Sequence, residues 1–197
     1  MQRALGAMTP LQALSEKARA CTLCPLPHPH RPVFRVSETA RILIAGQAPG
    51  VRVQASGKPF TDPSGDRLRA WMGVDEDTFY DASQVAILPM GFCFPGLDAK
   101  GGDLPPRREC APQWREAFLD LMPNIETTLL VGGYALRWAM KTTNVTDAVR
   151  DWRRRAPVIF PLPHPSWRNN AWLKCNPWFE TETLPALRGR LAALLKP

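Results

Sequence analysis

The chain contains four short apolar segments. They are Arg41–Ala45, Val85–Leu88, Thr128–Val131 and Val158–Leu162, and none of them alternates cleanly between apolar and polar residues. Strands that are covered on both faces have this uninterrupted apolar character, which is typical of a parallel sheet. The pattern therefore predicts four buried strands that share one parallel sheet.

Stretches with helical periodicity lie before, between and after these segments. The first follows Thr9, a suitable N-cap, and has proline at its first helical position. Because strands alternate with helices, we predict a three-layer α/β/α sandwich around a central four-stranded parallel sheet, formed by one domain over residues 1–197. The predicted helices are Pro10–Ala20, Asp66–Trp71, Pro112–Met122, Tyr134–Met140, Val145–Arg154 and Leu184–Leu195.

The composition is that of an ordinary folded domain. Of the 197 residues, 45% are hydrophobic and 22% are charged, which excludes a disordered chain. No apolar run approaches the roughly 20 residues that span a bilayer. The first residues also lack the apolar core and cleavage site of a signal peptide. We expect a cytoplasmic monomer that has no membrane partner.

Positive charge is concentrated in the last third of the chain. The formal net charge is +7, with 11 basic and 4 acidic side chains in residues 137–197 and 14 of each before them. Such an excess indicates a surface that meets a polyanion, nucleic acid first, although a solvated face that binds nothing also fits it. Because Arg153–Arg155 precede the fourth predicted strand and Arg168 follows it, we expect this charge to surround the loop after that strand.

Four of the five cysteines have a suggestive spacing. Cys21 and Cys24 form a C-x-x-C pair, Cys93 and Cys110 follow far downstream, and Cys175 stands alone. A cytosolic chain keeps its thiols reduced, so a disulfide framework is not expected. Four such thiols could close a cage around zinc or an iron–sulfur cluster, and the alternative is a set of unrelated free thiols.

Glycine- and proline-rich loops follow the first strand. The first loop, residues 46–50, reads GQAPG and would let backbone amides approach a ligand, although such a turn is often only a turn. The next, residues 57–65, carries Phe60, either a stacking platform for a planar ligand or a core aromatic. Asp62 in the same loop could cap the next helix or act as a carboxylate in the site.

The loop after the fourth strand holds a histidine between two prolines. His164 could donate a hydrogen bond to charge that develops on a leaving group, although a lone histidine is often structural. Trp167 and Arg168 follow it and could serve as an apolar wedge and a phosphate or base contact.

In this order, the motifs resemble the uracil-DNA glycosylase superfamily, most closely its iron–sulfur branch, family 4. The likeness runs from about Cys21 to Ser166 and rests on GQAPG at 46–50, GKPF at 57–60, HPS at 164–166 and the cysteine spacing C-x2-C-x68-C-x16-C. The resemblance implies an enzyme of base excision repair. It would flip a damaged base out of DNA and hydrolyse its N-glycosidic bond, without cutting the strand.

The resemblance also assigns roles to residues. Phe60 would stack on the flipped base, His164 would donate to its carbonyl oxygen, and backbone amides at Gln47 and Ala48 would hold the base and the attacking water. The residues that would contact the DNA strand are Ser166, Trp167 and Arg168. The ligands of a structural [4Fe–4S] cluster would be Cys21, Cys24, Cys93 and Cys110.

Two positions depart from the pattern of the family. Gln47 and Ala48 stand where relatives have a glutamate or an aspartate, and a glutamine cannot take a proton from water. Asp62 is the nearest carboxylate in the sequence that could substitute. Pro89 stands where the iron–sulfur branch has a base-reading asparagine, so recognition would pass to backbone groups near Met90 and Gly91, or the substrate is not uracil.

Three functions are therefore open at the level of the sequence. The first is a glycosylase for uracil or a related deaminated base such as xanthine or hypoxanthine. The second is a catalytically silent iron–sulfur protein that binds lesions in DNA. The third is a small-molecule enzyme on an α/β scaffold, which would lack salt-sensitive affinity for DNA.

Overall fold

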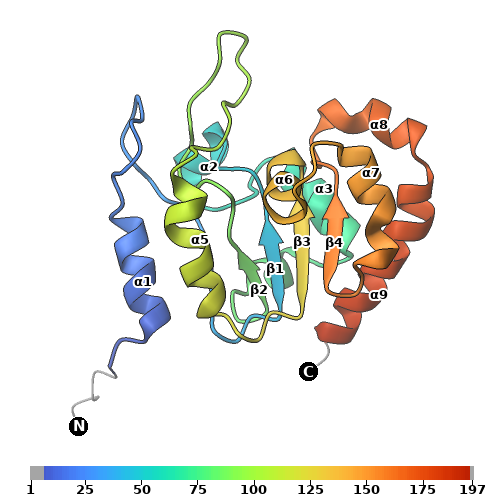
Figure 1. Ribbon diagram of the computed structural model, residues 1–197, viewed down its shortest axis with the longest axis horizontal. Helices are drawn as coiled ribbons and strands as arrows, with labels where there is room; N and C mark the ends of the chain where they lie inside the picture. Colours follow the sequence, from blue (N-terminus) through green and yellow to red (C-terminus); the bar gives the residue numbers. More distant parts are fainter. Residues whose placement is uncertain (1–6, 196–197) are drawn as a thin grey trace.

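The four predicted strands form one all-parallel sheet in the order β2–β1–β3–β4 (Figure 1). The computed structural model describes residues 7–195. The strands are β1 (Ile42–Ala45), β2 (Val85–Ile87), β3 (Thr127–Val131) and β4 (Ile159–Leu162). Each lies within one residue of its predicted bounds, so the apolar segments of the sequence are confirmed as strands.

Helices cover both faces of the sheet and make the predicted three-layer α/β/α sandwich (Figure 1). The α-helices are α1 (Pro10–Arg19), α2 (Val51–Ser56), α3 (Pro63–Met72), α4 (Glu76–Tyr80), α5 (Cys110–Asp120), α6 (Gly133–Met140), α7 (Val145–Arg150), α8 (Asn170–Cys175) and α9 (Leu184–Leu194). Two 3₁₀ turns, η1 (Asp151–Arg154) and η2 (Trp167–Asn169), and a π-helical turn, η3 (Phe179–Thr183), complete the order.

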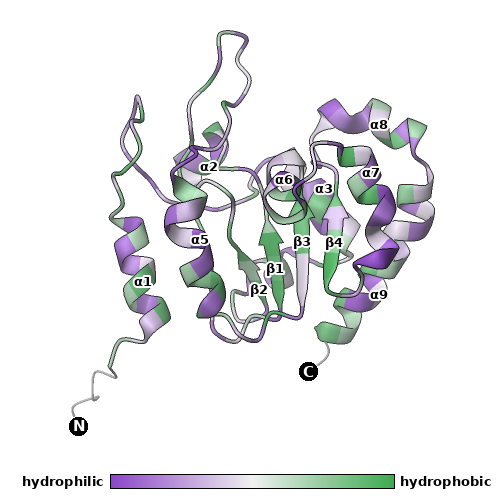
Figure 2. Cartoon of the chain, viewed as in Figure 1, coloured by the Kyte–Doolittle hydropathy of each residue, from purple (hydrophilic) through white to green (hydrophobic). Residues whose placement is uncertain are grey.

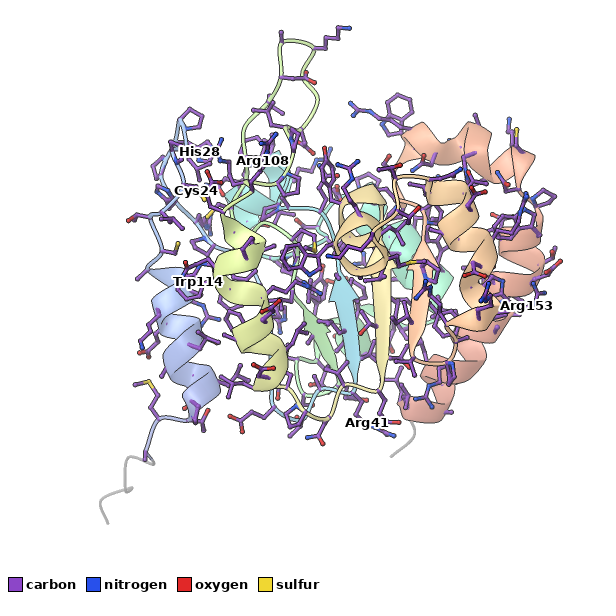
Figure 3. The ribbon with its side chains drawn as sticks, viewed as in Figure 1. Cys24, His28, Arg41, Arg108, Trp114 and Arg153 are labelled. Atoms are coloured by element: carbon purple, nitrogen blue, oxygen red, sulfur yellow. The ribbon has the colours of Figure 1, made fainter. Side chains whose placement is uncertain are left out.

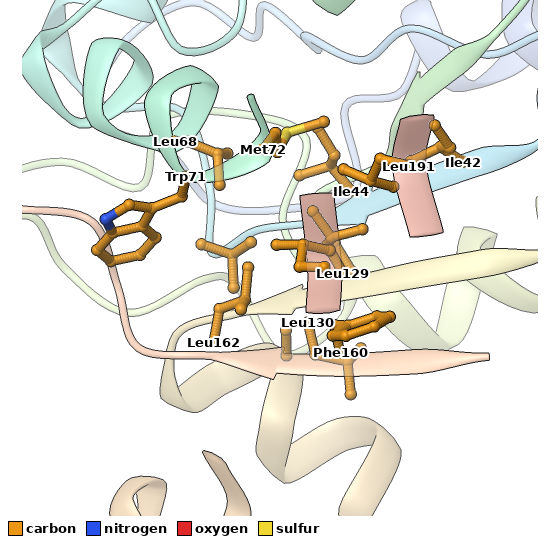
Figure 4. Packing of buried hydrophobic residues seen from close by; sticks show 14 of the residues in the cluster. Ile42, Ile44, Leu68, Trp71, Met72, Leu129, Leu130, Phe160, Leu162 and Leu191 are labelled. Atoms are coloured by element: carbon orange, nitrogen blue, oxygen red, sulfur yellow. The ribbon is translucent and has the colours of Figure 1, made fainter. Parts of the chain in front are cut away.

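Alternate residues of β1 pack into two different hydrophobic clusters, one on each face of the sheet. Ile42 and Ile44 of β1 face one side, where α3 and α9 pack against the sheet (Figure 4). Leu43 faces the other side, with Phe118 of α5, and α1 packs outside α5. Because both faces are covered, every residue of β1 is buried, and β1 and β2 are coloured as hydrophobic in Figure 2.

Several helices differ from the sequence prediction in where they begin, in how they end or in being unpredicted. Helix α3 begins at Pro63, earlier than predicted, because the Asp62 side chain accepts a hydrogen bond from the backbone of Gly65 and caps it. The predicted helix Val145–Arg154 is α7 followed by the tighter turn η1. The short helices α2, α4 and α8 were not predicted, since five or six residues are too few to display a helical period.

The carboxyl ends of the strands meet at one edge, which positions the site. Backbone pairing continues past the strands, since Met90 N donates to Gly46 O and Gly91 N donates to Gln47 O, each at 2.9 Å. On the other side of β1, Gly132 N donates to Leu162 O at 2.9 Å. The chain order reverses between β1 and β3, the place where open α/β sheets bind ligands.

Within residues 7–195, no helix is both long and apolar enough to cross a membrane.

Candidate active site at the carboxyl edge of the sheet

Phe60 lies over the turn that follows β1. A Cβ added to Gly46 would come within 3.2 Å of Phe60 Cζ, so the glycine lets the ring rest on the backbone of the turn. The ring also meets Phe79 edge to face, with centroids 5.9 Å apart. Because Phe60 is only partly buried, part of its surface remains open to a ligand at this edge.

The backbone of Phe60 is held in an unusual conformation. Its φ is 56°, in the left-handed region that costs a bulky residue of the order of 1–3 kcal/mol. The Tyr80 hydroxyl stabilises it, lying 2.7 Å from Pro59 O and 3.1 Å from Phe60 O. Burial raises the pKa of Tyr80, which keeps this hydroxyl protonated as a donor. The fold therefore enforces the presentation of the Phe60 ring.

Asp62 caps the helix that follows it, as predicted, and its charge reaches His164, while a role as a carboxylate in the reaction stays a prediction. Its Oδ1 accepts a hydrogen bond from Gly65 N at 3.2 Å and so caps α3. Its charge also acts on His164, whose pKa it raises against the larger effect of burial. The structure thus brings Asp62 and His164 together at the same edge from two distant loops.

His164 is a half-buried, neutral imidazole with a fixed orientation. Ser166 N donates to His164 Nδ1 at 3.2 Å, so in the neutral ring the proton lies on Nε2. Burial lowers its pKa below the ordinary value, and Arg168 acts in the same direction. Asn169 Nδ2 donates to His164 O at 2.6 Å and braces the loop. His164 can therefore donate a hydrogen bond through Nε2 without carrying a charge.

The tip of the His164 loop projects from the surface. The Trp167 side chain is 72% exposed, an unusual state for an indole in a folded domain. The Arg168 guanidinium carbon lies 6.0 Å from the centre of the Trp167 ring. Arg67 Nη1 donates to Ser166 O at 3.2 Å and ties the loop to α3.

The predicted base-binding backbone near β2 is largely engaged within the protein. The N–H groups of Met90 and Gly91 donate to the turn after β1, as described above, and Phe92 N donates to Cys110 Sγ at 3.3 Å. Carbonyl groups and the Met90 side chain are thus what this segment can offer a base. Ala48 packs beside it, 3.4 Å from a Cβ placed on Gly91. Gln47 makes no side-chain hydrogen bond within the described chain.

Asp103 is a site residue that the sequence reasoning missed. It lies on the long loop between β2 and α5, and its Oδ2 is 3.3 Å from a Cβ placed on Gly50. The residue as a whole is exposed, and partial burial of its carboxyl group raises its pKa, with the charge of Arg168 acting against this and that of Asp62 adding to it. No motif marks this aspartate in the sequence, because only the folded loop brings it to the turn after β1.

A basic cleft of about 820 Å³ lies beside the site. Its floor includes Met90, and Tyr134 and Trp138 of α6 form part of its wall. Four cations line it: Arg107, Arg108, Arg137 and Lys141. Within residues 7–195, only Arg107 of these four has a carboxylate partner, Glu109 at 3.2 Å. The cleft therefore offers aromatic surface and uncompensated positive charge next to the candidate base site.

The four cysteines of the predicted cage line one small pocket between α1 and α5. Figure 3 shows Cys24 near the amino end of α5, close to His28 and Arg108. Cys110 accepts the hydrogen bond from Phe92 N, and Arg107, which also lines this pocket, lowers the pKa of Cys24 against the larger effect of burial. Among residues 7–195, no group of three or more His, Cys, Asp or Glu side chains is arranged to hold a single metal ion.

The arginines of residues 153–155 do not surround the His164 loop, so that expectation is wrong for them. Residues 153–155 precede β4 and so lie at the end of the strand opposite to His164. Arg153 pairs with Glu182, and Arg154 lies 3.7 Å from Asp151. Figure 3 places Arg153 on the far flank of the molecule from Cys24. Two cations of the last third, Arg137 of α6 and Lys141 just after it, line the cleft, together with Arg107 and Arg108 of the loop before α5.

Fold and site together define an α/β protein whose parallel sheet brings a presented aromatic ring, a neutral histidine and a basic cleft to its carboxyl edge. The family model of the uracil DNA glycosylase superfamily matches residues 34–188, and the chain belongs to this superfamily, whose members are in general glycosylases that act on DNA. The match begins after Cys21 and Cys24, so it confirms the superfamily and leaves the iron–sulfur branch a prediction.

Proposed function

We propose that the protein is a monofunctional DNA glycosylase that removes uracil or a related deaminated base as a cytoplasmic monomer. The observation that carries this proposal is the pairing, at one edge of the sheet, of a presented aromatic ring with a half-buried neutral histidine. A flipped base needs both features, a π-surface on which to stack and a donor for its carbonyl oxygen.

His164 would stabilise the leaving base. As the N-glycosidic bond breaks, positive charge builds on the sugar and negative charge builds on the base. A neutral Nε2–H that is already oriented and desolvated can donate to the base oxygen with little reorganisation. The bond from Ser166 N to Nδ1 fixes the tautomer that this requires.

DNA would be gripped from two sides of the base site. The exposed Trp167 ring has the size to fill the gap that a flipped base leaves in the stack, with Arg168 beside it on the backbone. The cleft lined by Arg137 and Lys141 would hold phosphates, because these two cations lack carboxylate partners within the described chain.

The cysteine pocket fits an iron–sulfur cluster better than a single zinc ion. Burial raises the pKa of Cys93 to about 11 and that of Cys110 to about 12, so thiolates there need a metal to neutralise them. N–H groups that donate to the sulfurs are common around such clusters. Each cysteine of a cluster binds a different iron, so the sulfurs stand farther apart than the roughly 4 Å between ligands of one zinc ion.

Cys21, Cys24, Cys93 and Cys110 would hold a [4Fe–4S] cluster, which would join α1 to α5 rather than take part in hydrolysis. Purified protein should then be brown, and Cys24→Ser should lose iron and melt at a lower temperature. Cys175→Ser is the matched control, because Cys175 is exposed and remote from the pocket. Colourless protein that contains zinc would contradict the cluster.

The test of the function is excision from labelled oligonucleotides that carry uracil, xanthine or hypoxanthine. Alkali-labile product supports a glycosylase, and His164→Ala should lower its single-turnover rate by about 10²–10³-fold, the usual cost of one such donor. Retarded mobility without product would instead support a silent lesion-binding protein. That alternative is favoured by one observation, the absence of a carboxylate at Gln47 and Ala48.

A further inference from the structure

Asp103 belongs to a hairpin that its own hydrogen bonds hold in shape. Residues Leu97 and Asp103 form an antiparallel bridge, and Leu104 N donates to Gly96 O at 2.9 Å. The turn between them is fixed by Asp98, whose Oδ1 accepts from Lys100 N at 2.8 Å and from Gly102 N at 2.9 Å. Asp103 is therefore delivered to the site by an ordered element.

The carboxylate of Asp103 is directed toward the turn after β1 and is not used by the fold. Its Oδ2 lies 3.3 Å from a Cβ placed on Gly50, which ends the GQAPG turn. Within residues 7–195 it makes no hydrogen bond and no ion pair. Asp62, in contrast, is engaged as the cap of α3. Of the two acidic side chains at this edge, Asp103 is thus the one left available for a ligand.

We infer that Asp103 is the catalytic carboxylate of the proposed reaction, supplied from the hairpin in place of the acidic residue that Gln47 and Ala48 lack. The inference rests on the proposed function and adds a residue to it. The glycine at position 50 leaves room for the Asp103 carboxylate, because a side chain there would contact the carboxylate and displace it.

The proposed hydrolysis of the N-glycosidic bond uses one carboxylate beside the turn after β1. The oxygen of water forms a bond to C1′ of the sugar, and the C1′–N bond breaks with its electron pair leaving on the base. The proton of the water passes to the Asp103 carboxylate and then to solvent, while the base anion that His164 stabilises takes up a proton from solvent. Before the proton moves, the negative carboxylate also stabilises the positive charge on the sugar.

The experiment compares Asp103→Asn with Asp62→Asn and with Asp77→Asn, an exposed control carboxylate at the start of α4 that makes no side-chain hydrogen bond among the described residues. Single-turnover excision is measured on the base that the wild type removes best, from pH 4 to pH 9, with melting temperature and affinity for abasic DNA measured alongside. Asp103→Asn should lower the rate at pH 7.5 by about 10²-fold or more, a typical contribution of a general base.

Two further readouts separate catalysis from a structural role. Burial raises the pKa of Asp103, so the wild-type rate should fall as the pH drops through that raised pKa, and this acid limb should disappear in Asp103→Asn. Its melting temperature and its affinity for abasic DNA should stay those of the Asp77→Asn control. Gly50→Ala, which displaces the carboxylate without removing it, should slow excision to a smaller extent.

The outcomes distinguish the two proposals. Wild-type excision together with an Asp103→Asn rate and acid limb equal to those of the wild type would overturn the role of Asp103 alone. Loss of the rate in Asp62→Asn but not in Asp103→Asn would assign the carboxylate to Asp62 and also overturn it. Wild-type protein that excises no base from the panel would overturn the proposed function and the inference with it.

Discussion

The carbonyl oxygen of Phe60 occupies the space that a side chain on Gly65 would need. A Cβ added to Gly65 would lie 1.9 Å from Phe60 O, far inside contact distance. Gly65 belongs to the first turn of α3, so the start of that helix passes directly beneath the residue that presents the aromatic ring. The left-handed conformation of Phe60 therefore depends on a glycine at position 65.

Gly65→Ala should therefore disable the site. The new Cβ must push Phe60 out of its left-handed conformation or displace α3, and overpacking of this kind costs about 1–3 kcal/mol of stability. We expect a lower melting temperature and loss of excision. The control is Gly189→Ala in α9, where a Cβ meets no atom within 4 Å and should be neutral or stabilising. Equal activity in the two variants would contradict the coupling of Gly65 to Phe60.

The half-buried imidazole of His164 should make stability depend on pH. Its pKa in the folded protein is lowered, chiefly by burial, so the unfolded chain binds a proton more readily. The stabilisation is present above the ordinary pKa of about 6.5 and is lost as the pH falls below that value toward the lower pKa of the folded state.

Wild-type protein should thus lose more stability than His164→Gln between pH 7.5 and pH 5. The difference should grow by at most about 1.4 kcal/mol per pH unit, the slope for one proton. Urea unfolding of both proteins at several pH values measures it. Parallel pH curves for the two proteins would mean that His164 does not bind its proton differently on folding.

Trp167 should matter for duplex DNA and little for single strands. Its ring is 72% exposed, so Trp167→Ala removes few contacts and should leave the melting temperature unchanged. In a duplex, the ring would offset the few kcal/mol that unstacking a base costs, and a single strand avoids most of that cost. We expect excision from duplex substrate to fall at least tenfold more than excision from single-stranded substrate. An equal fall on both would argue against a wedge.

The fold could be predicted because its signal is local. Uninterrupted apolar segments such as Ile42–Ala45 mark buried parallel strands, and their spacing leaves room only for crossover helices. The short helices were not predicted, because contacts with residues elsewhere in the chain stabilise them. In α8, for example, Trp172 Nε1 donates a hydrogen bond to Thr146 Oγ1 of α7 at 2.8 Å. A sequence window of six residues carries no trace of such a partner.

The site was predictable where its residues lie in glycine–proline motifs. Phe60 and His164 could be identified because a strand end and neighbouring prolines fix their position in the sequence as well as in space. Asp103 could not, since 52 residues separate it from Gly50 and no pattern encodes their approach. The charge of residues 153–155 misled for a different reason: these residues precede β4 and so lie at its amino end, whereas His164 follows its carboxyl end.

The basic cleft should determine how DNA affinity depends on salt. Each phosphate contact that is lost reduces the slope of log affinity against log salt concentration by about 0.9 for duplex DNA. Arg137→Ala and Lys141→Ala together should therefore lower the slope by nearly 2 and weaken binding for every sequence, because neither cation has a carboxylate partner in the part of the chain that the structure describes. Arg153→Ala with Arg154→Ala is the control of equal charge on the far flank, where both arginines pair with acidic residues. Fluorescence anisotropy across 50–300 mM salt measures the slopes, and equal slopes for the two double variants would show that the cleft is not where DNA binds.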